Sequence, residues 1–281
     1  MKSASAKTRS GAALQDFWAP PHQPWLEIRN TADSRQSYAE HFHLTFSVGL
    51  IAAGETRVVC AGTDYQAQTG DIVLIEPGAV HKCNPLGDGA RSYHMIYLDP
   101  AWCLAQAGWP DSAAIAVKDS QRVVRDIRLF QALAASAEEI FRHRQANEAE
   151  LGGLIGQLLR GYCRAETSGG EARPPVAEAR RRVGADLENR VRMAEVARGL
   201  GLSREGFIRS FRRSTGMTPG GYRHCLRLLA ARRLLRQGVH IAQAALAAGY
   251  VDQSHFHRMF VKYFSVTPGQ YRVNRSLFYN K

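Results

Sequence analysis

Residues 203–223 read SREGFIRSFRRSTGMTPGGYR, and residues 252–272 read DQSHFHRMFVKYFSVTPGQYR. Aligned at an offset of 49 residues, the two segments are identical at 8 of their 21 positions. An internal repeat of this length is typical of a supersecondary unit that occurs more than once, although solenoids generally need at least about three copies. Two copies therefore predict a bilobed domain in the carboxyl-terminal part of the chain.

Each copy has the residue pattern of a helix-turn-helix. In the first copy, Met193–Leu200 is amphipathic, Gly201 suits a turn, and Ser203 is a natural N-cap for the helix that follows. Phe207 and Phe211 lie four residues apart in that second helix, so both would face the core. The opposite face is left for a partner, which is the geometry of a recognition helix.

The second copy repeats this arrangement, with Ile241–Ala248 as its first helix and Asp252 as the expected cap of its second. After each recognition helix, the sequence Thr-Pro-Gly-x-Tyr-Arg begins a further helix, because threonine caps and proline suits the first helical position. In the first copy this helix is predicted to run to Gly238, which is long enough to join the two motifs rigidly.

The outward faces of the two recognition helices carry side chains that can contact DNA. Arginine and glutamine make paired hydrogen bonds with base edges, each worth about 1–3 kcal/mol of discrimination. Arg209 and Arg258 occupy the same position in both copies, whereas most other outward positions differ. We therefore expect an asymmetric site of two dissimilar major-groove segments about 34 Å apart. The predicted DNA-binding residues are Arg204, Glu205, Ile208, Arg209 and Arg212 in the first copy, and Gln253, Ser254, His257, Arg258 and Lys262 in the second.

The positive charge of the chain is concentrated in this same region. The 281 residues carry a formal net charge of +12, and residues 171–281 hold 21 Lys and Arg against 7 Asp and Glu. Arginine outnumbers lysine there, and guanidinium groups contact phosphates bidentately and release counterions on binding. Such an imbalance favours a polyanionic partner, with double-stranded DNA as the leading candidate, over a merely solvated surface.

The amino-terminal half has a different pattern. The first 25 residues are polar and then proline-rich, which indicates an arm rather than a packed element. Short β-rich segments separated by glycine turns follow, as is typical of a small sandwich or barrel. The clearest predicted strands are His41–Ile51, Thr56–Cys60, Asp71–Glu76 and Ser92–Leu98. Beyond Asp119, apolar residues recur at steps of three and four, which predicts helices that either cover the β domain or pair with a second subunit.

The stretch IAQAALAAGYVDQSHFHRMF at 241–260, followed by TPGQYR at 267–272, resembles the signature of the AraC/XylS-type transcription regulators. In that family, two helix-turn-helix units joined by a long helix enter successive major grooves on one face of DNA. The resemblance covers about the last hundred residues. It implies a sequence-specific DNA-binding transcription regulator.

His41-Phe42-His43 and the later stretch GDIVLIEPGAVH at 70–81 resemble the cupin-like ligand-binding domain at the amino terminus of many such regulators. Inside a barrel these histidines and His81 would hydrogen-bond an organic effector, bind a metal as in catalytic cupins, or have a structural role alone. Because no firm carboxylate ligand is evident, we assign no metal site and no cofactor. The predicted effector-binding residues are His41, His43, His81, Tyr93, Met95 and Tyr97, although either alternating set of residues around His94 can face inward.

The expected fold class is α+β, with an N-terminal cupin-like β-barrel and flanking helices and a C-terminal all-α domain of two helix-turn-helix units. Trp18 and Trp25 either close over bound effector, as the arm does in the family, or anchor the arm to the barrel. The predicted segments are an arm (1–25), a cupin-like ligand-binding domain (26–117), a helical cover or dimerisation segment (118–166), a linker (167–175) and a DNA-binding domain (176–281).

We expect an activator that responds to a small-molecule effector in the barrel, acts with RNA polymerase as a homodimer, and is not an enzyme. Two alternatives stay open: a metal-dependent cupin enzyme with a DNA-binding tail, and a ligand-independent regulator whose barrel only dimerises. The five cysteines are scattered and include no C-x-x-C pair, which is typical of reduced thiols in the cytoplasm. No signal peptide and no membrane-spanning segment are expected from the sequence.

Overall fold

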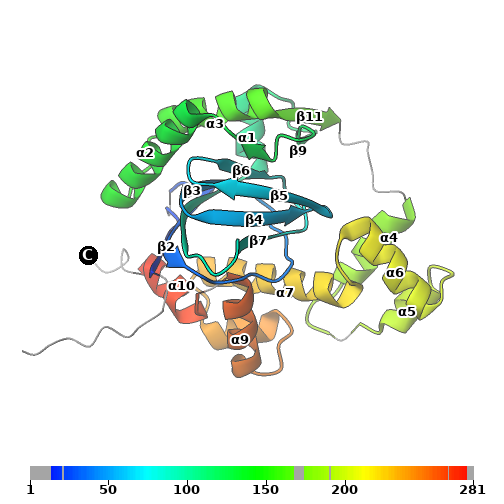
Figure 1. Ribbon diagram of the computed structural model, residues 1–281. Coiled ribbons are helices and arrows are strands. Elements are labelled where there is room, and N and C mark those ends of the chain that lie inside the picture. The colour runs from blue at the N-terminus through cyan, green and yellow to red at the C-terminus, as the bar shows by residue number, and fades with distance from the viewer. Residues whose placement is uncertain (1–13, 21, 168–173, 190, 265, 277–281) are drawn as a thin grey trace, which may run out of the picture.

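The computed structural model describes residues 14–20, 22–167, 174–189, 191–264 and 266–276. Figure 1 shows a β-rich domain between two sets of helices, with a smaller helical lobe beside it. On one side lie α2 (Ile127–His143) and α3 (Glu148–Tyr162); on the other lie α7 (Pro219–Arg236), α9 (Gln253–Phe264) and α10 (Pro268–Ser276). The lobe contains α4 (Pro174–Gly184), α5 (Met193–Arg198) and α6 (Arg204–Thr215). The predicted α+β fold is confirmed.

Two antiparallel sheets form the β domain. The larger sheet has the strand order β1-β2-β8-β3-β6-β10, and the smaller sheet has the order β5-β4-β7. The strands are β1 (Leu14–Trp18), β2 (Leu26–Ser34), β3 (Phe46–Ala53), β4 (Glu55–Cys60), β5 (Thr63–Gln68), β6 (Ile72–Ile75), β7 (His81–Pro85), β8 (Arg91–Leu98) and β10 (Val123–Val124).

The larger sheet is buried on both of its faces. One face packs against α2, α3 and α1 (Pro100–Ala107), where Val48 and Leu50 of β3 join the main hydrophobic core. The other face, represented by Ile51, meets the smaller sheet in a second apolar cluster. Strands β9 (Ala113–Val117) and β11 (Cys163–Thr167) form a separate antiparallel pair beside the helices. The main core therefore lies between the larger sheet and the helices, and a smaller apolar cluster lies between the two sheets.

Two elements differ from the expectations for the amino-terminal half. The predicted strand from His41 begins only at Phe46, and His41 instead makes an isolated bridge to His81. The last part of the expected arm is not free, because β1 pairs along its whole length with β2. Strand β1 is too short for alternation to be recognised in sequence, yet its Phe17 and Trp18 are 6% and 4% exposed. Within the predicted arm, residues 1–13 and 21 lie outside the described residues.

The arm tryptophans anchor the chain to the barrel domain. Trp18 belongs to the main hydrophobic core, and Trp25 stacks on Trp102 with ring centroids 4.1 Å apart. The segment predicted to be helical from residue 118 also contains short strands, since Val123–Val124 and Cys163–Thr167 pair in sheets. The predicted linker, 167–175, lies mostly outside the described residues.

In the carboxyl-terminal domain, α7 joins the two predicted motifs. Thr218 caps α7 by accepting a hydrogen bond from the Gly221 amide at 3.2 Å, and Pro219 takes the first helical position. Helix α7 ends at Arg236, and Gly238, two residues later, has a positive φ of 85°. The second motif then begins with α8 (Ile241–Ala247). The long connecting helix predicted between the two motifs is therefore present.

Candidate DNA interface and effector cavity

The recognition helix of the first copy, α6, is fixed by its cap and its inner face. Ser203 accepts a hydrogen bond from the Gly206 amide at 3.1 Å. Phe207 and Phe211 are 1% and 2% exposed and meet edge to face, with centroids 5.6 Å apart. The inner face of α6 is thus held in the core, and its outer face lies in solvent.

The recognition helix of the second copy, α9, is held in the same way. Asp252 caps it by accepting a hydrogen bond from the His255 amide at 2.7 Å, and Phe256 and Phe260 are fully buried. The turn before it needs Gly249, whose φ is 79° and whose position leaves no room for a side chain: a Cβ there would lie 2.2 Å from the Leu187 carbonyl oxygen. Both copies are helix-turn-helix motifs, as predicted.

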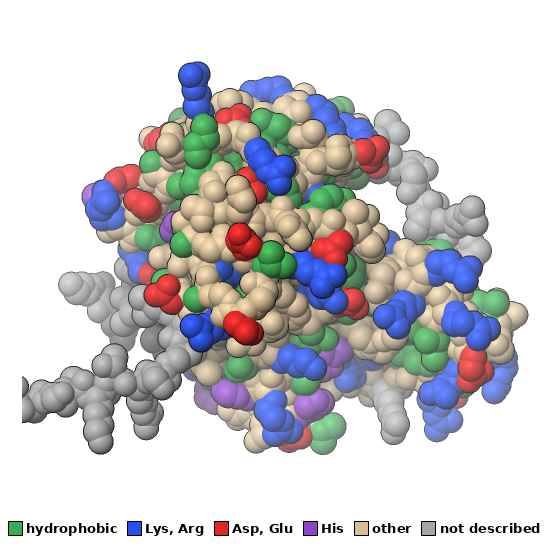
Figure 2. Space-filling model, viewed as in Figure 1, with side chains coloured by type: hydrophobic (Ala, Val, Ile, Leu, Met, Phe, Trp, Pro, Cys, Tyr) green, Lys and Arg blue, Asp and Glu red, His purple; other side chains and the backbone are tan. Residues whose placement is uncertain are grey.

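The ten predicted DNA-contact residues lie on the outer faces of α6 and α9. All are exposed except Ile208, which is half-buried. Within the described ranges, none of the basic residues in this set forms an ion pair with a carboxylate of the protein, so their charges are available to a partner. Figure 2 shows Lys and Arg side chains gathered over the lobe of α4, α5 and α6. Contact of these residues with DNA stays a prediction.

Not every arginine of this domain faces solvent. Arg223, in the shared Tyr-Arg of the repeat, is 6% exposed and donates to the carbonyl oxygens of Val183 and Ala185 at 2.9 and 2.8 Å. Arg227 donates to the Leu187 carbonyl at 2.8 Å. These arginines tie the loop after α4 to α7, so part of the charge excess serves the structure.

A cavity lies between the two sheets and reaches the DNA-binding domain. The space between its lining atoms is about 580 Å³ when open solvent at the mouth is included, but only about 50 Å³ can hold the centre of a water molecule, so a ligand larger than a few waters needs the wall to move. Strands of the barrel supply most of its wall. Tyr38, His41 and His43, from the segment between β2 and β3, and Tyr263 and Phe264, at the end of α9, complete it. The second recognition helix therefore ends at the wall of the cavity.

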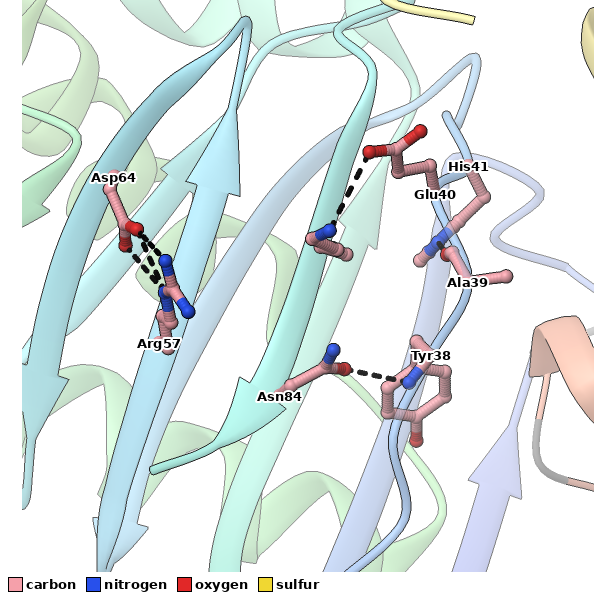
Figure 3. Close-up of polar contacts among 8 residues, drawn as sticks. Tyr38, Ala39, Glu40, His41, Arg57, Asp64 and Asn84 are labelled. Carbon is pink, nitrogen blue, oxygen red and sulfur yellow. Dashed lines mark hydrogen bonds and ion pairs between the residues drawn. The ribbon is translucent and has the colours of Figure 1, made fainter. Parts of the chain in front are cut away.

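Three histidines share one wall of this cavity. The backbones of His41 and His81 exchange two hydrogen bonds, of 3.0 and 2.8 Å. The ring centroid of His43 lies 4.8 Å from that of His41 and 5.0 Å from that of His81. Figure 3 shows the chain from Tyr38 to His41 lying beside β7, where the side-chain oxygen of Asn84 accepts a hydrogen bond from the Tyr38 amide at 2.7 Å. The segment before β3 thus positions His41 without belonging to a strand.

Burial favours the neutral form of His41 and His81, and a backbone contact defines the tautomer of each. Nδ1 of His41 and Nδ1 of His81 lie 2.8 and 2.9 Å from the carbonyl oxygens of Ala39 and Ala79. A carbonyl only accepts, so each Nδ1 carries a proton. Burial lowers the pKa of His81 to about 4 and holds the pKa of His41 well below 6.5. Each Nε2 therefore keeps a free lone pair.

The three histidines are close enough together to be considered as ligands of a metal ion. One nitrogen from each of His41, His43 and His81 lies within 4.8 Å of the other two, which is close enough for three ligands of one ion. Within the described residues, however, no carboxylate accompanies them, and the guanidinium groups of Arg29 and Arg91 line the same cavity. Two buried cations make this donor set a poor fit for a resident metal ion.

All six residues predicted to bind effector line this one cavity. In β8 the inward set is Tyr93, Met95 and Tyr97, whereas His94 lies beside Phe141 of α2 at 6.3 Å. The cavity is also lined by residues that were not predicted from the sequence, among them Arg29, Tyr38, Arg91, Tyr263 and Phe264. A signal for the last two exists in the repeat, because the aligned positions of the first copy are Ser214 and Thr215.

A buried ionic contact joins the barrel to the DNA-binding domain. Glu27 of β2 is 2% exposed; it pairs with Arg232 and Arg236 of α7 and accepts a hydrogen bond from the Tyr271 hydroxyl at 2.9 Å. Burial alone would raise the pKa of Glu27, but the two guanidinium groups and the hydroxyl hold it below its ordinary value. Phe17 of β1 adds an edge-to-face contact with Tyr271 at 5.8 Å.

Comparison with known proteins agrees with this architecture. A family described as the AraC-like ligand binding domain matches residues 26–159, and a family described as a helix-turn-helix domain matches residues 196–274. The chain belongs to the AraC family of helix-turn-helix transcription regulators. It is thus a DNA-binding regulator with a ligand-binding domain rather than an enzyme, which excludes the cupin-enzyme alternative.

Several AraC-family relatives align over most of their length. The chain is 27% identical to the uncharacterised regulator YbfI of Bacillus subtilis, over 78% of this chain and 82% of that protein. It is 25% identical to the transcriptional activator RhaS of Pectobacterium carotovorum, over 84% of this chain and 88% of that protein. These relatives share both domains with the chain.

The fold also resembles a solved structure. ToxT of Vibrio cholerae with bound unsaturated fatty acid has a TM-score of 0.56 at 13% identity, covering 95% of this chain and 97% of that chain. At this identity the likeness concerns the fold alone. In the described part of this chain, no helix is long and apolar enough to cross a membrane.

Proposed function

We propose that this AraC-family protein is a transcription activator controlled by a small molecule that binds in the barrel cavity. The observation that carries the proposal is the shared wall of the cavity: residues of the barrel and of α9 line the same space. A ligand there contacts the sensor and the second recognition helix at once. Such a ligand shifts the arrangement of the two domains by as much as its affinities for the alternative arrangements differ.

One hydrogen bond links the cavity wall directly to the recognition helix. Arg29 Nη1 donates to the Phe264 carbonyl at 3.4 Å, and the ring of Tyr263 lies 6.5 Å from that of His41. A ligand that engages Arg29 or His41 therefore changes the contacts that hold the end of α9. We propose this route for the coupling of effector binding to DNA binding.

The proposed DNA contacts are tested with alanine variants of the two equivalent arginines. We expect Arg209→Ala and Arg258→Ala each to weaken binding to the DNA site recovered by genome-wide mapping by at least fivefold, since a paired arginine contact contributes about 1–3 kcal/mol. Gel-shift titrations across a series of salt concentrations measure the loss. Arg142→Ala is the control, because this exposed arginine of α2 pairs with Glu139, far from both recognition helices in sequence. Wild-type affinity in both recognition-helix variants would sink the assignment.

Activation is proposed because relatives that align over both domains, including RhaS, are named activators. Transcription in vitro from a promoter that carries the mapped site, with purified RNA polymerase, tests this directly. Output that rises with the protein supports activation, and output that falls identifies a repressor. The cytoplasmic location and the homodimer belong to the same proposal, and sedimentation analysis of the purified protein tests the dimer.

A thermal-shift screen of metabolites distinguishes the proposed ligand-responsive regulator from the alternative, a ligand-independent regulator whose barrel only dimerises. A ligand selective for the folded state raises its stability by mass action. We expect compounds from one chemical class to raise the melting temperature in a concentration-dependent way. A broad screen without any stabilising compound would favour the ligand-independent regulator.

A further inference from the structure

Two buried arginines line the cavity without a carboxylate partner. Arg29 of β2 is 4% exposed and Arg91 of β8 is 1% exposed. Their guanidinium carbons lie 5.3 and 5.2 Å from the centre of the same Tyr93 ring. No acidic side chain belongs to the cavity lining, and within the described ranges neither arginine forms an ion pair. The positive charge of both is therefore uncompensated.

Two other buried arginines show the contrast, whereas a third, Arg223, has no carboxylate partner but donates to four backbone carbonyl groups. Arg122 pairs with Glu76 at 2.6 Å, and Arg232 pairs with Glu27. Glu27 lies two positions from Arg29 in β2, yet it is committed to α7 and does not line the cavity. Burial of an unpaired guanidinium is costly, so the cavity is built to receive a negative charge.

Hydrogen-bond accounting leaves donors free for an anion. A guanidinium has five N–H groups. Arg29 uses four of them, on Thr31, the Phe264 carbonyl and the hydroxyls of Tyr38 and Tyr93. Arg91 donates three, and its Nε is buried without any partner. Three donors therefore remain on the two side chains.

His41 and His81 present hydrogen-bond acceptors to the cavity, whereas the two arginines present donors. Nδ1 of His41 and of His81 is bound to a backbone carbonyl, which leaves Nε2 of each ring as an acceptor in the cavity wall. The two ring centroids are 4.4 Å apart. Neighbouring acceptors match hydroxyl donors of a ligand and repel a carboxylate oxygen.

We propose that the effector is a small hydroxylated carboxylate, whose carboxylate is held by Arg29 and Arg91 and whose hydroxyl groups donate to the histidine pair. Apolar residues of the wall, such as Ile51 and Val73, pack against its carbon skeleton. This inference rests on the proposed function of the cavity as the effector site, and it adds the chemical class of the effector.

The test uses matched ligands on the full-length protein. D-gluconate, D-glucuronate and 4-hydroxybenzoate are compared with the corresponding neutral amides, and benzoate serves as an acid without a hydroxyl. Thermal shift and isothermal titration calorimetry at millimolar concentrations provide the two measurements. We expect at least one hydroxylated acid to bind, at least tenfold more tightly than its amide and than an acid of similar size without hydroxyl groups.

Variants of Arg29 then locate the binding. Arg29→Gln removes the charge and should weaken the acid at least tenfold, whereas Arg29→Lys keeps the charge and should retain part of the affinity. The ligand comparison on the wild-type protein stands on its own if Arg29→Gln does not fold.

Each outcome decides a different question. Amides that bind as well as their acids overturn the carboxylate inference and leave the effector function in place. Uptake of a stoichiometric divalent metal without any carboxylate also overturns it. If neither the acids nor the amides bind, the carboxylate inference is contradicted. The effector function itself would be excluded only if a broad metabolite screen were also negative.

Discussion

The two helix-turn-helix copies share a scaffold and differ in what lies at the end of the recognition helix. In the first copy, Ser214 and Thr215 donate to carbonyl oxygens of their own helix, α6. At the aligned positions of the second copy, Tyr263 and Phe264 line the effector cavity. A duplicated unit has thus kept its caps and phenylalanine pairs in both copies. Both copies touch the barrel domain, since Tyr222 of the first stacks on Phe42, but among the described residues only the second copy lines the cavity.

The largest expected effect comes from removal of an equivalent core residue in each copy. Phe207→Ala and Phe256→Ala should each destabilise their own lobe by about 3–5 kcal/mol, since both side chains are almost fully buried. Hydrogen exchange should then be faster in α6 for the first variant and in α9 for the second. Only Phe256→Ala should also speed exchange in β2 and β8, and a similar effect of Phe207→Ala on these strands would break the comparison.

The next largest effect is expected from loss of the ionic contact between the barrel and α7. Glu27→Gln should cost about 3–5 kcal/mol in urea unfolding, because it leaves Arg232 buried without its counter-charge. Glu139→Gln is the matched control; its partner Arg142 is exposed, so the loss should be below about 1 kcal/mol. Equal losses in the two variants would show that the interdomain pair has no special role.

The ion pair between Glu27 and Arg232 also makes the stability of the protein depend on pH, in a direction that can be predicted. The folded-state pKa of Glu27 lies below its ordinary value of 4.5, so the contribution of the pair is complete above that pH. It is lost as the pH falls through the folded-state pKa. The stability of wild type relative to Glu27→Gln should therefore shrink in acid, and a difference that stays constant from pH 6 to pH 3 would contradict this.

A smaller effect is expected from an exchange between the two copies. Tyr263→Ser places the first-copy residue in the cavity wall and should weaken the stabilising ligand about tenfold, which corresponds to a loss of ~1.4 kcal/mol. The reciprocal change, Ser214→Tyr, lies at an exposed position of α6 and should leave ligand affinity unchanged. Calorimetric titration of both variants measures the difference, and equal losses would remove the asymmetry.

The helix caps should show the smallest effect and no asymmetry. Ser203→Ala and Asp252→Ala each remove one side-chain acceptor from the first turn of a recognition helix, at about 1 kcal/mol. Amide exchange at Gly206 and His255 reports the local loss. A cost confined to one copy would mean that the two helix starts are not equivalent.

The carboxyl-terminal half was predictable because its structure is specified locally. The caps Ser203 and Asp252, the glycine turns and the paired phenylalanines all act within a few residues of one another. The exposure of Arg209 and Arg258 follows from the same periodicity. The burial of Arg223 does not, because its acceptors are carbonyl groups at the end of α4 and in the loop after it, some forty residues earlier.

The effector cavity was predictable only in part. The histidines and the inward residues of β8 followed from motif and alternation, whereas Arg29 occupies the alternate face of β2, which in an ordinary sheet faces water. That face is buried because the DNA-binding domain covers it, as the contact of Glu27 with α7 shows. Strand alternation cannot reveal such a covering element, since the covering residues lie more than 200 positions away.

Hydrogen exchange of the full-length protein, with and without a saturating stabilising ligand, tests the shared cavity wall most directly. The account predicts slower exchange in β2, in β8 and in the last turn of α9, with no change in α6. Protection confined to the barrel, or equal in α6 and α9, would contradict the proposal that α9 is the recognition helix that contacts a ligand in the cavity.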